Sequence, residues 1–236
     1  MIQTMLLTAE NTSWIAKLLP GVADNPTRFY NAIRDTLLMV AWSGALMLIL
    51  GMILGVALTV TAKGGILQNR VVHEILDKLI NILRSIPFVL LIVLLFDVSG
   101  AIMGTSSGVK GAIIPLVVGS APFFARQVES ALAGIGGGVV EAAKAMGCGP
   151  TEIIFRVYLK EGAAAIARGA TITVINLIGL TAMAGWVGAG GLGDYAVTWG
   201  HNYGKDDIIY VSVLAIIVIV CVIQLIGTLI AKKNTH

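Results

Sequence analysis

Long apolar runs dominate the sequence. The two clearest cover residues 36–62 and 208–231, and about 20 apolar residues in a helix are enough to cross the hydrocarbon core of a bilayer. Three weaker runs lie between them, at residues 76–96, 111–132 and 170–187. The runs are continuous and lack the period-two alternation of membrane β-strands. The pattern therefore predicts an all-α membrane protein with five transmembrane helices.

The three weaker runs carry residues that are uncommon in lipid-facing helices. Apart from several glycines, these are Arg84, Pro87, Pro115, Pro122 and Asn176. Such residues are typical of helices that face other protein segments or a solute path. We therefore expect these three helices to face protein or a solute path instead of lipid.

The basic residues predict the orientation of the chain, because Lys and Arg are concentrated in cytoplasmic loops. Five spans put the two termini on opposite sides. Ten of the 16 basic residues fall on one side: Lys63, Arg70, Lys78, Arg126, Lys144, Arg156, Lys160, Arg168, Lys232 and Lys233. Five fall on the other: Lys17, Arg28, Arg34, Lys110 and Lys205. We expect the C-terminus and the loop at residues 133–165 to be cytoplasmic.

The same orientation divides the chain into two parts. Residues 1–31 form an extracytoplasmic N-terminal segment, with a surface-lying helix around residues 14–19. Residues 32–236 form one transmembrane domain. We find no internal repeat and no second domain in the sequence.

Composition narrows the function. With 57% hydrophobic and 12% charged residues, the chain is more apolar than soluble domains are. Its net charge of +3 is spread along the sequence, which does not favour nucleic-acid binding. Cys148 and Cys221 are expected to be free thiols, and no histidine has a companion at metal-ligand spacing. There is no GxxxxGK[ST] motif and no paired nucleophile and base, so we expect no cofactor, no metal and no catalysis by this chain alone.

A helical knuckle is predicted in the long loop, where residues 138–162 read GVVEAAKAMGCGPTEIIFRVYLKEG. A first helix covers residues 139–146 and is stopped by residues 147–150, and Thr151 caps a second helix. The alanines leave little side chain between backbone and surroundings, so a partner protein can seat the first helix closely. An ordinary connecting loop is the alternative interpretation.

The knuckle resembles the cytoplasmic signature of the permease subunits of ABC importers. That signature is EAA, three residues, Gly, nine residues, then a hydrophobic residue, any residue, Leu and Pro. Its first half is matched by Glu141, Ala142, Ala143 and Gly147, and its second by Val157, Tyr158 and Leu159. Lys160 stands where the family usually has proline, so we expect the second helix to continue without the usual kink.

Three further stretches resemble the methionine-type importer permeases in particular: NILRSIPFVLL at residues 81–91, SAPFFARQVESAL at 120–132 and IGLTAMAGWVGAGGLG at 178–193. The resemblance implies a five-helix permease with a cytoplasmic coupling helix between spans three and four. It also implies pairing of two identical permeases in a bacterial cell membrane. Two ATP-binding cassette subunits, which hold ATP and Mg, dock on them, and an extracytoplasmic binding protein delivers the cargo. The coupling residues that it implies are Glu141, Ala142, Ala143, Met146 and Gly147.

Candidates for the solute path or its gate lie in spans two and four. Arg84 is strongly basic inside a span, next to Ser85 and the helix-breaking Pro87. It either reaches the cytoplasmic interface or forms a polar contact near the inner gate. Asn176 can bind the polar end of an amino acid, and Met183 its apolar tail. Packing and hydrogen bonds between helices explain both residues equally well.

Gly188, Gly190 and Gly193 satisfy the GxGxxG pattern. They follow a membrane helix instead of a strand and lie away from the cytoplasm, so we interpret them as a flexible or closely packed turn and not as a nucleotide site. For the whole protein, the sequence leaves three alternatives to a methionine importer. They are an importer of the same class for another cargo, a channel or carrier that works without an ATPase, and a structural scaffold.

Overall fold

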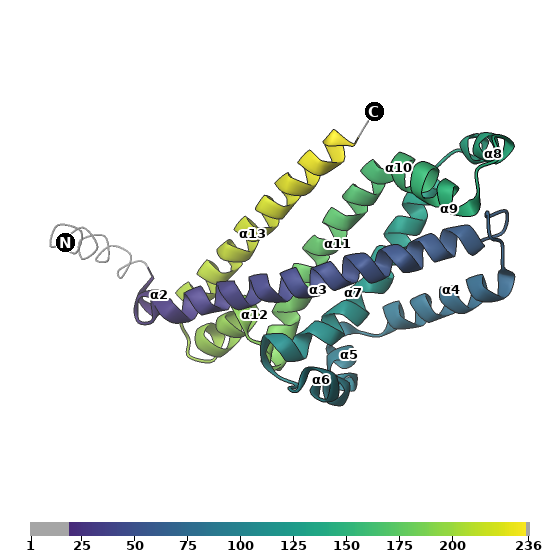
Figure 1. The fold of residues 1–236 in the computed structure, drawn as a ribbon. Coiled ribbons are helices and arrows are strands. Elements are labelled where there is room, and N and C mark those ends of the chain that lie inside the picture. Colours follow the sequence, from purple (N-terminus) through teal and green to yellow (C-terminus); the bar gives the residue numbers. More distant parts are fainter. Residues whose placement is uncertain (1–18, 235–236) are drawn as a thin grey trace.

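The computed structural model describes residues 19–234, and every regular element in this part of the chain is helical (Figure 1). The predicted surface helix at residues 14–19 lies almost wholly outside the described residues. The four longest helices are α3 (Pro26–Thr61), α7 (Gly108–Ala133), α11 (Ala163–Ala184) and α13 (Asp206–Lys233). Shorter elements connect them: α2 (Pro20–Ala23), α4 (Arg70–Ser85), α5 (Phe88–Leu94), α6 (Phe96–Met103), α8 (Gly137–Ala145), α9 (Pro150–Glu152), the π-helical η1 (Ile153–Tyr158), α10 (Leu159–Glu161), η2 (Gly185–Ala189), α12 (Gly191–Asp194) and η3 (Tyr195–His201).

Four helices in the described chain are long and apolar enough to cross a membrane: α3, α7, α11 continued through η2, and α13. They contain four of the five predicted spans, apart from Ala62 at the end of the first. Helix α3 begins earlier than predicted, because Pro26 occupies its first turn and the Asn25 side chain accepts a hydrogen bond of 3.2 Å from the Arg28 N–H.

The expected single helix over residues 76–96 is wrong. Helix α4 ends at Ser85, Ile86 is extended (φ −79°, ψ 123°), and α5 begins after Pro87. Proline has no N–H for the helix ladder and disfavours helical geometry at the preceding residue, which accounts for the break at this position. The run then continues as two short helices, α5 and α6, that pack on α7.

The core forms where α3 crosses α7, the most extensive contact between two elements in the chain. Gly51 and Gly55 lie one turn apart on α3 and let the helices approach closely. A Cβ at Gly51 would lie 2.9 Å from the Ala121 carbonyl oxygen, and one at Gly55 would lie 2.5 Å from the Val128 Cβ. Because the two glycines have no side chains, this part of α7 packs directly against the backbone of α3.

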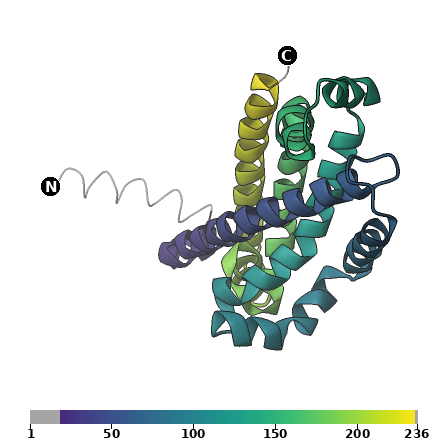
Figure 2. The same ribbon diagram turned by 45° about the vertical axis from the view of Figure 1, so that its right-hand side comes forward.

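The end of the molecule where α3 and α13 begin is held together by contacts between segments that are far apart in the sequence. The Asp207 carboxylate accepts a hydrogen bond of 2.7 Å from the Gly21 N–H, and Thr36 Oγ1 accepts one of 2.8 Å from the Leu192 N–H. These bonds tie α2 to the start of α13, and α12 to the first third of α3. In both views α3 and α13 begin on the left of the helical bundle, beside α12 (Figure 2).

The GxGxxG segment is part of this closed end. Gly188 and Gly190 adopt left-handed φ angles of 93° and 79°, and a Cβ at Gly193 would lie 2.1 Å from the Ala182 carbonyl oxygen. The segment is thus a closely packed turn, the second of the two forms expected for it.

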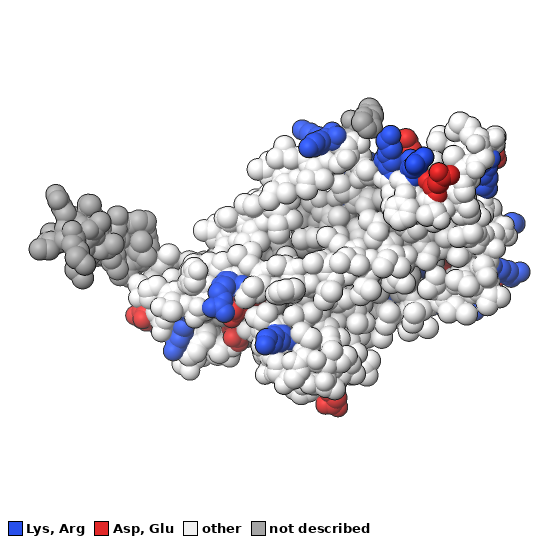
Figure 3. All heavy atoms as spheres, viewed as in Figure 1, with Lys and Arg blue, Asp and Glu red and all other residues white. Residues whose placement is uncertain are grey.

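Charged side chains gather at the two ends of the molecule and leave a broad uncharged zone between them (Figure 3). One end carries the knuckle and the α3–α4 connection, and the other carries α2, α6 and α12 (Figure 1). Such a zone fits the hydrocarbon core of a bilayer, which solvates no exposed charge.

Candidate coupling and translocation sites

The predicted helix of the knuckle is present as α8, and its C-terminus is closed by a Schellman motif. The Gly147 N–H donates to the Lys144 carbonyl (3.0 Å), and the Cys148 N–H donates to the Ala143 carbonyl (3.1 Å). Gly147 has a φ of 82°, a left-handed conformation that glycine adopts without strain. This geometry explains why glycine stands at this position of the signature.

The candidate coupling residues divide between the two faces of α8. Glu141, Ala142 and Gly147 are exposed, and Met146 is 76% exposed, which is unusual for a large apolar side chain outside the membrane zone. Ala143 points the other way: it is 3% exposed and belongs to the chain's own core. Only the exposed face of α8 is accessible, and Ala143 packs the helix against the rest of the chain.

The second helix of the knuckle begins differently from the prediction. Thr151 is not its cap: Gly149 is, Pro150 fills the first helical position, and the Glu152 carboxylate accepts a hydrogen bond of 3.2 Å from the Gly149 N–H. Proline at the first position suits a helix start, because its missing N–H has no partner there anyway.

The helix that follows passes through Lys160 as expected. It runs through η1 and α10 to Glu161 before a turn at Gly162. Tyr158 of the signature is buried beside this turn, and burial raises the pKa of its hydroxyl. The second half of the signature thus packs inward and supports α8.

Two of the candidate gate residues line one cavity. It has a volume of about 230 Å³ and is formed by α4, α5, α7 and α11 around the break at Pro87. Arg84 and Asn176 are its strongly polar side chains, and its walls are Leu83, Ile86, Phe88, Leu91, Gly119, Phe123 and Leu180. The Arg84 guanidinium carbon lies 5.8 Å from the centre of the Phe123 ring, within cation–π range. A cation, an amide and apolar walls are the groups that a small zwitterionic solute with an apolar tail needs.

The other three candidates do not line this cavity. The Ser85 hydroxyl is exposed and donates a hydrogen bond of 2.7 Å to the Ile82 carbonyl. Pro87 shapes the cavity only by breaking the helix. Met183 is 41% exposed near the far end of α11.

An ion-pair network that was not predicted from the sequence joins α4 to α7. Its α4 residues precede those that line the cavity. Arg126 on α7 pairs with Asp77 on α4, donates a hydrogen bond of 2.9 Å to the Asn81 side chain, and pairs with Glu129 at 2.7 Å. The Arg126 side chain is only 20% exposed. The spacing of Arg126 and Glu129, three residues apart on one helix face, was a signal in the sequence. The other two partners, Asp77 and Asn81, could not be predicted in this way, because they lie on α4, 49 and 45 positions away.

A metal centre finds no support in the part of the chain that the structure describes. Across residues 19–234 no three His, Cys, Asp or Glu side chains are grouped so that they could hold an ion.

Comparison with known families decides the class of the protein. The model of the binding-protein-dependent transport system inner membrane component matches residues 47–234. The chain belongs to this family. It is an inner-membrane transport component, with the all-helical fold described above.

Curated relatives of this inner-membrane component agree over almost the whole chain. It is 42% identical to the probable D-methionine transport system permease protein MetI of Vibrio cholerae, over 90% of this chain and 94% of that protein. It is 44% identical to the methionine import system permease protein MetP of Bacillus subtilis, over 92% of this chain and 96% of that protein.

Solved structures share the fold. A chain from inward-facing conformations of the MetNI methionine ABC transporter superposes with a TM-score of 0.87 at 38% identity, covering 89% of this chain and 97% of that one. A chain of an amino acid ABC transporter superposes with a TM-score of 0.75 at 12% identity, which shows a common fold alone.

Proposed function

We propose that this chain is the permease subunit of an ATP-driven importer for methionine in a bacterial cell membrane. The observation that carries the proposal is the match to methionine permeases at 42 and 44% identity over nine-tenths of the chain. The cavity between Arg84 and Asn176 supports the cargo, because its polar and apolar groups suit an amino acid with an apolar side chain.

The working unit contains two copies of this chain, with the solute path between them. Two ATPase subunits bind at the cytoplasmic side and supply ATP and Mg, and a solute-binding protein docks outside. The fold shared with the MetNI methionine transporter supports this assembly. The absence of a P-loop motif from the sequence agrees with ATP hydrolysis by a partner instead of by this chain.

Each copy crosses the membrane five times, with the N-terminus outside and the C-terminus in the cytoplasm. The second span is the broken segment formed by α4 and α5, which supplements the four long helices. Irregular backbone inside a membrane is tolerated where it lines a cavity, and Ile86 and Phe88, on either side of Pro87, line one. The ten-to-five distribution of basic residues supports this orientation.

Helix α8 is the coupling helix. Its exposed residues Glu141, Ala142 and Met146 seat in a groove of the ATPase, and Gly147 ends the helix so that the contact surface is short and rigid. When ATP draws the ATPases together, the two α8 helices move with them, and the path changes from inward to outward access. Nucleotide shifts this equilibrium only by its different affinity for the two states.

The test begins with purification of the tagged chain from its native cells in a mild detergent. Partner subunits are identified, and the complex is reconstituted in liposomes with the binding protein for uptake of labelled methionine. We expect an ATPase to co-purify and uptake to require ATP. Recovery of the chain without any ATPase, or uptake without ATP, would overturn the transporter class. Stronger competition by another amino acid would overturn the cargo alone.

A further inference from the structure

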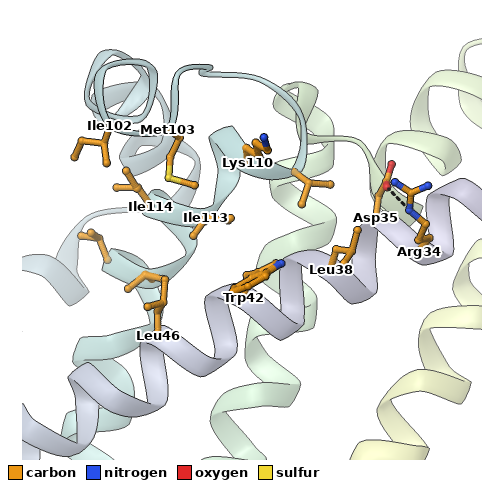
Figure 4. A pocket seen from close by; sticks show the side chains of 13 residues that line it. Arg34, Asp35, Leu38, Trp42, Leu46, Ile102, Met103, Lys110, Ile113 and Ile114 are labelled. Carbon is orange, nitrogen blue, oxygen red and sulfur yellow. Dashed lines mark ion pairs between the residues drawn. The ribbon is translucent and has the colours of Figure 1, made fainter.

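A large groove lies away from the gate, on the outer half of the bundle. It has a volume of about 860 Å³ and lies between α3, the end of α6 and the first turns of α7. Apolar side chains line most of it: Leu38, Trp42, Leu46, Ile102, Met103, Val109, Ile113, Ile114, Val117 and Val118. Charged side chains, Arg34, Asp35 and Lys110, stand at one end (Figure 4).

The position of the charges matches the edge of a membrane. Lys110 lies in the first turn of α7, and Arg34 lies near the start of α3, so both stand at the outer end of their helices. At about 1.5 Å per residue, Leu46 lies about 18 Å along α3 from Arg34. One leaflet of a hydrocarbon core about 30 Å thick is about 15 Å deep. Helix α3 has 36 residues and is longer than the core is thick, so it must tilt, and the distance along its axis is an upper limit on the depth. The groove therefore begins at headgroup level and stays within about one leaflet.

The charge at the rim is suited to an anion. Arg34 and Asp35 lie 3.8 Å apart and partly compensate each other, whereas Lys110 is exposed and forms no ion pair within residues 19–234. A phosphate accepts hydrogen bonds from both cations, and its acyl chain covers the apolar wall below them. A second protein copy in the same place would remove Lys110 from water, and Asp35, the one carboxylate in the groove lining, already pairs with Arg34.

We propose that this groove binds one anionic phospholipid of the outer leaflet, with its phosphate at Lys110 and Arg34 and one acyl chain against Trp42 and Leu46. The proposal rests on the outward orientation of the N-terminus given above. It adds a lipid site, separate from the solute path, that steadies α3 against α7.

Trp42 reports on the groove directly, because it is 60% exposed and lies on the groove wall. The sequence contains four tryptophans, so replacement of Trp14, Trp186 and Trp199 by phenylalanine leaves Trp42 as the only indole of this chain, and the same complex with Trp42→Phe gives the background signal of the partner subunits. This protein, as the full complex, is reconstituted in liposomes that contain equal fractions of phosphatidylglycerol and phosphatidylcholine. Either one or the other lipid carries brominated acyl chains, which quench tryptophan fluorescence on contact.

We expect brominated phosphatidylglycerol to quench Trp42 at least twice as strongly as brominated phosphatidylcholine. In Lys110→Gln this difference should disappear. Lys205→Gln removes a positive charge at the same side but outside the groove, and it should keep the difference. Lipid binding in this groove does not depend on the cargo. The quenching results therefore test the lipid proposal separately from the uptake assays, which test the proposed function.

Two results would overturn the proposal. Equal quenching by both lipids in the unchanged groove would mean ordinary lipid contact without selection of charge. No quenching by either lipid would mean that protein, such as the second copy, covers Trp42.

Discussion

Arg126 of α7 pairs with Asp77 of α4 and thereby connects the helix that leads to the knuckle with the helix that ends at the gate. The two residues lie 49 positions apart, and Glu129 and Asn81 complete the network. Because the proposed movement acts on α8, directly after α7, this pair is a polar link between the helix before the knuckle and the broken span.

We predict that Arg126→Gln weakens both stability and transport. The substitution leaves the half-buried Asp77 and Glu129 without a cation, which should cost about 1–3 kcal/mol of unfolding free energy. Arg126→Lys keeps the charge but not the forked set of N–H donors. Its stability should therefore lie between that of Arg126→Gln and that of the unchanged protein. Thermal unfolding of the purified protein in detergent measures the effect.

Arg70→Gln is the matched control for this prediction. It also removes an arginine that pairs with a carboxylate on α4, but the Arg70–Glu74 pair is exposed, at 89% and 46% for the two side chains. Exposed pairs contribute little to stability, because water and salt screen the charges. If the two variants unfolded at the same temperature, the network around Arg126 would have no special role.

A second prediction separates the two faces of α8. Ala142 is exposed and Ala143 is buried, so the same substitution should act in different ways at neighbouring positions. Ala142→Glu should leave the thermal stability of the isolated permease unchanged and abolish co-purification of the ATPase. Ala143→Glu should destabilise the permease itself by about 3 kcal/mol or more, because it places an unpaired charge in the core. Retention of the ATPase by Ala142→Glu would contradict the proposed contact.

A third prediction concerns the close contact of α3 with α7. Gly55→Leu should destabilise the fold by about 1–3 kcal/mol or more, because its side chain would meet the Val128 side chain and the Ala125 carbonyl. Ala45→Leu, on the exposed face of the same helix, should be nearly neutral. Unfolding temperatures of the two variants, compared at equal expression, decide the question.

The sequence predicted most of the membrane architecture, because long apolar runs have one solution in lipid. It could not predict that Gly51 and Gly55 contact α7, because a pair of glycines in a helix does not indicate which other helix packs against them. Pro87 was visible as a helix breaker, yet its effect, an extended Ile86 between α4 and α5, was not anticipated as a full break.

The candidate sites were predictable to different degrees. The signature spacing located α8 and its end at Gly147, but not the inward direction of Ala143, which depends on how α8 packs on η1. In the sequence, Arg84 and Asn176 are two separate polar residues in different apolar runs. Only the fold shows that both line one cavity. Their common wall of Phe88, Gly119 and Phe123 carries no polar signal in the sequence.

The fourth prediction tests that cavity. Asn176→Leu should reduce methionine uptake about tenfold to a hundredfold, because a lost hydrogen bond to a charged group is worth about 1.5–3 kcal/mol. ATP hydrolysis without substrate should persist. Ile172→Leu, about one turn away on an exposed position of α11, is the control and should transport normally. Equal uptake by both variants would remove Asn176 from the solute path.

The last prediction tests the orientation on which the coupling proposal depends. Cys148 and Cys221 are the two cysteines of the chain, so their replacement by serine gives a background for single labels. In that background, Glu141→Cys on α8 should react with a membrane-impermeant maleimide only after the cells are opened, whereas Tyr203→Cys at the other end should react in intact cells. Both side chains are exposed in the permease chain alone, so the variants are expressed without the ATPase, and access to the reagent, not burial, then determines the result. Labelling of Glu141→Cys in intact cells would place α8 outside, where no cytoplasmic ATPase reaches it, and the coupling role would fail.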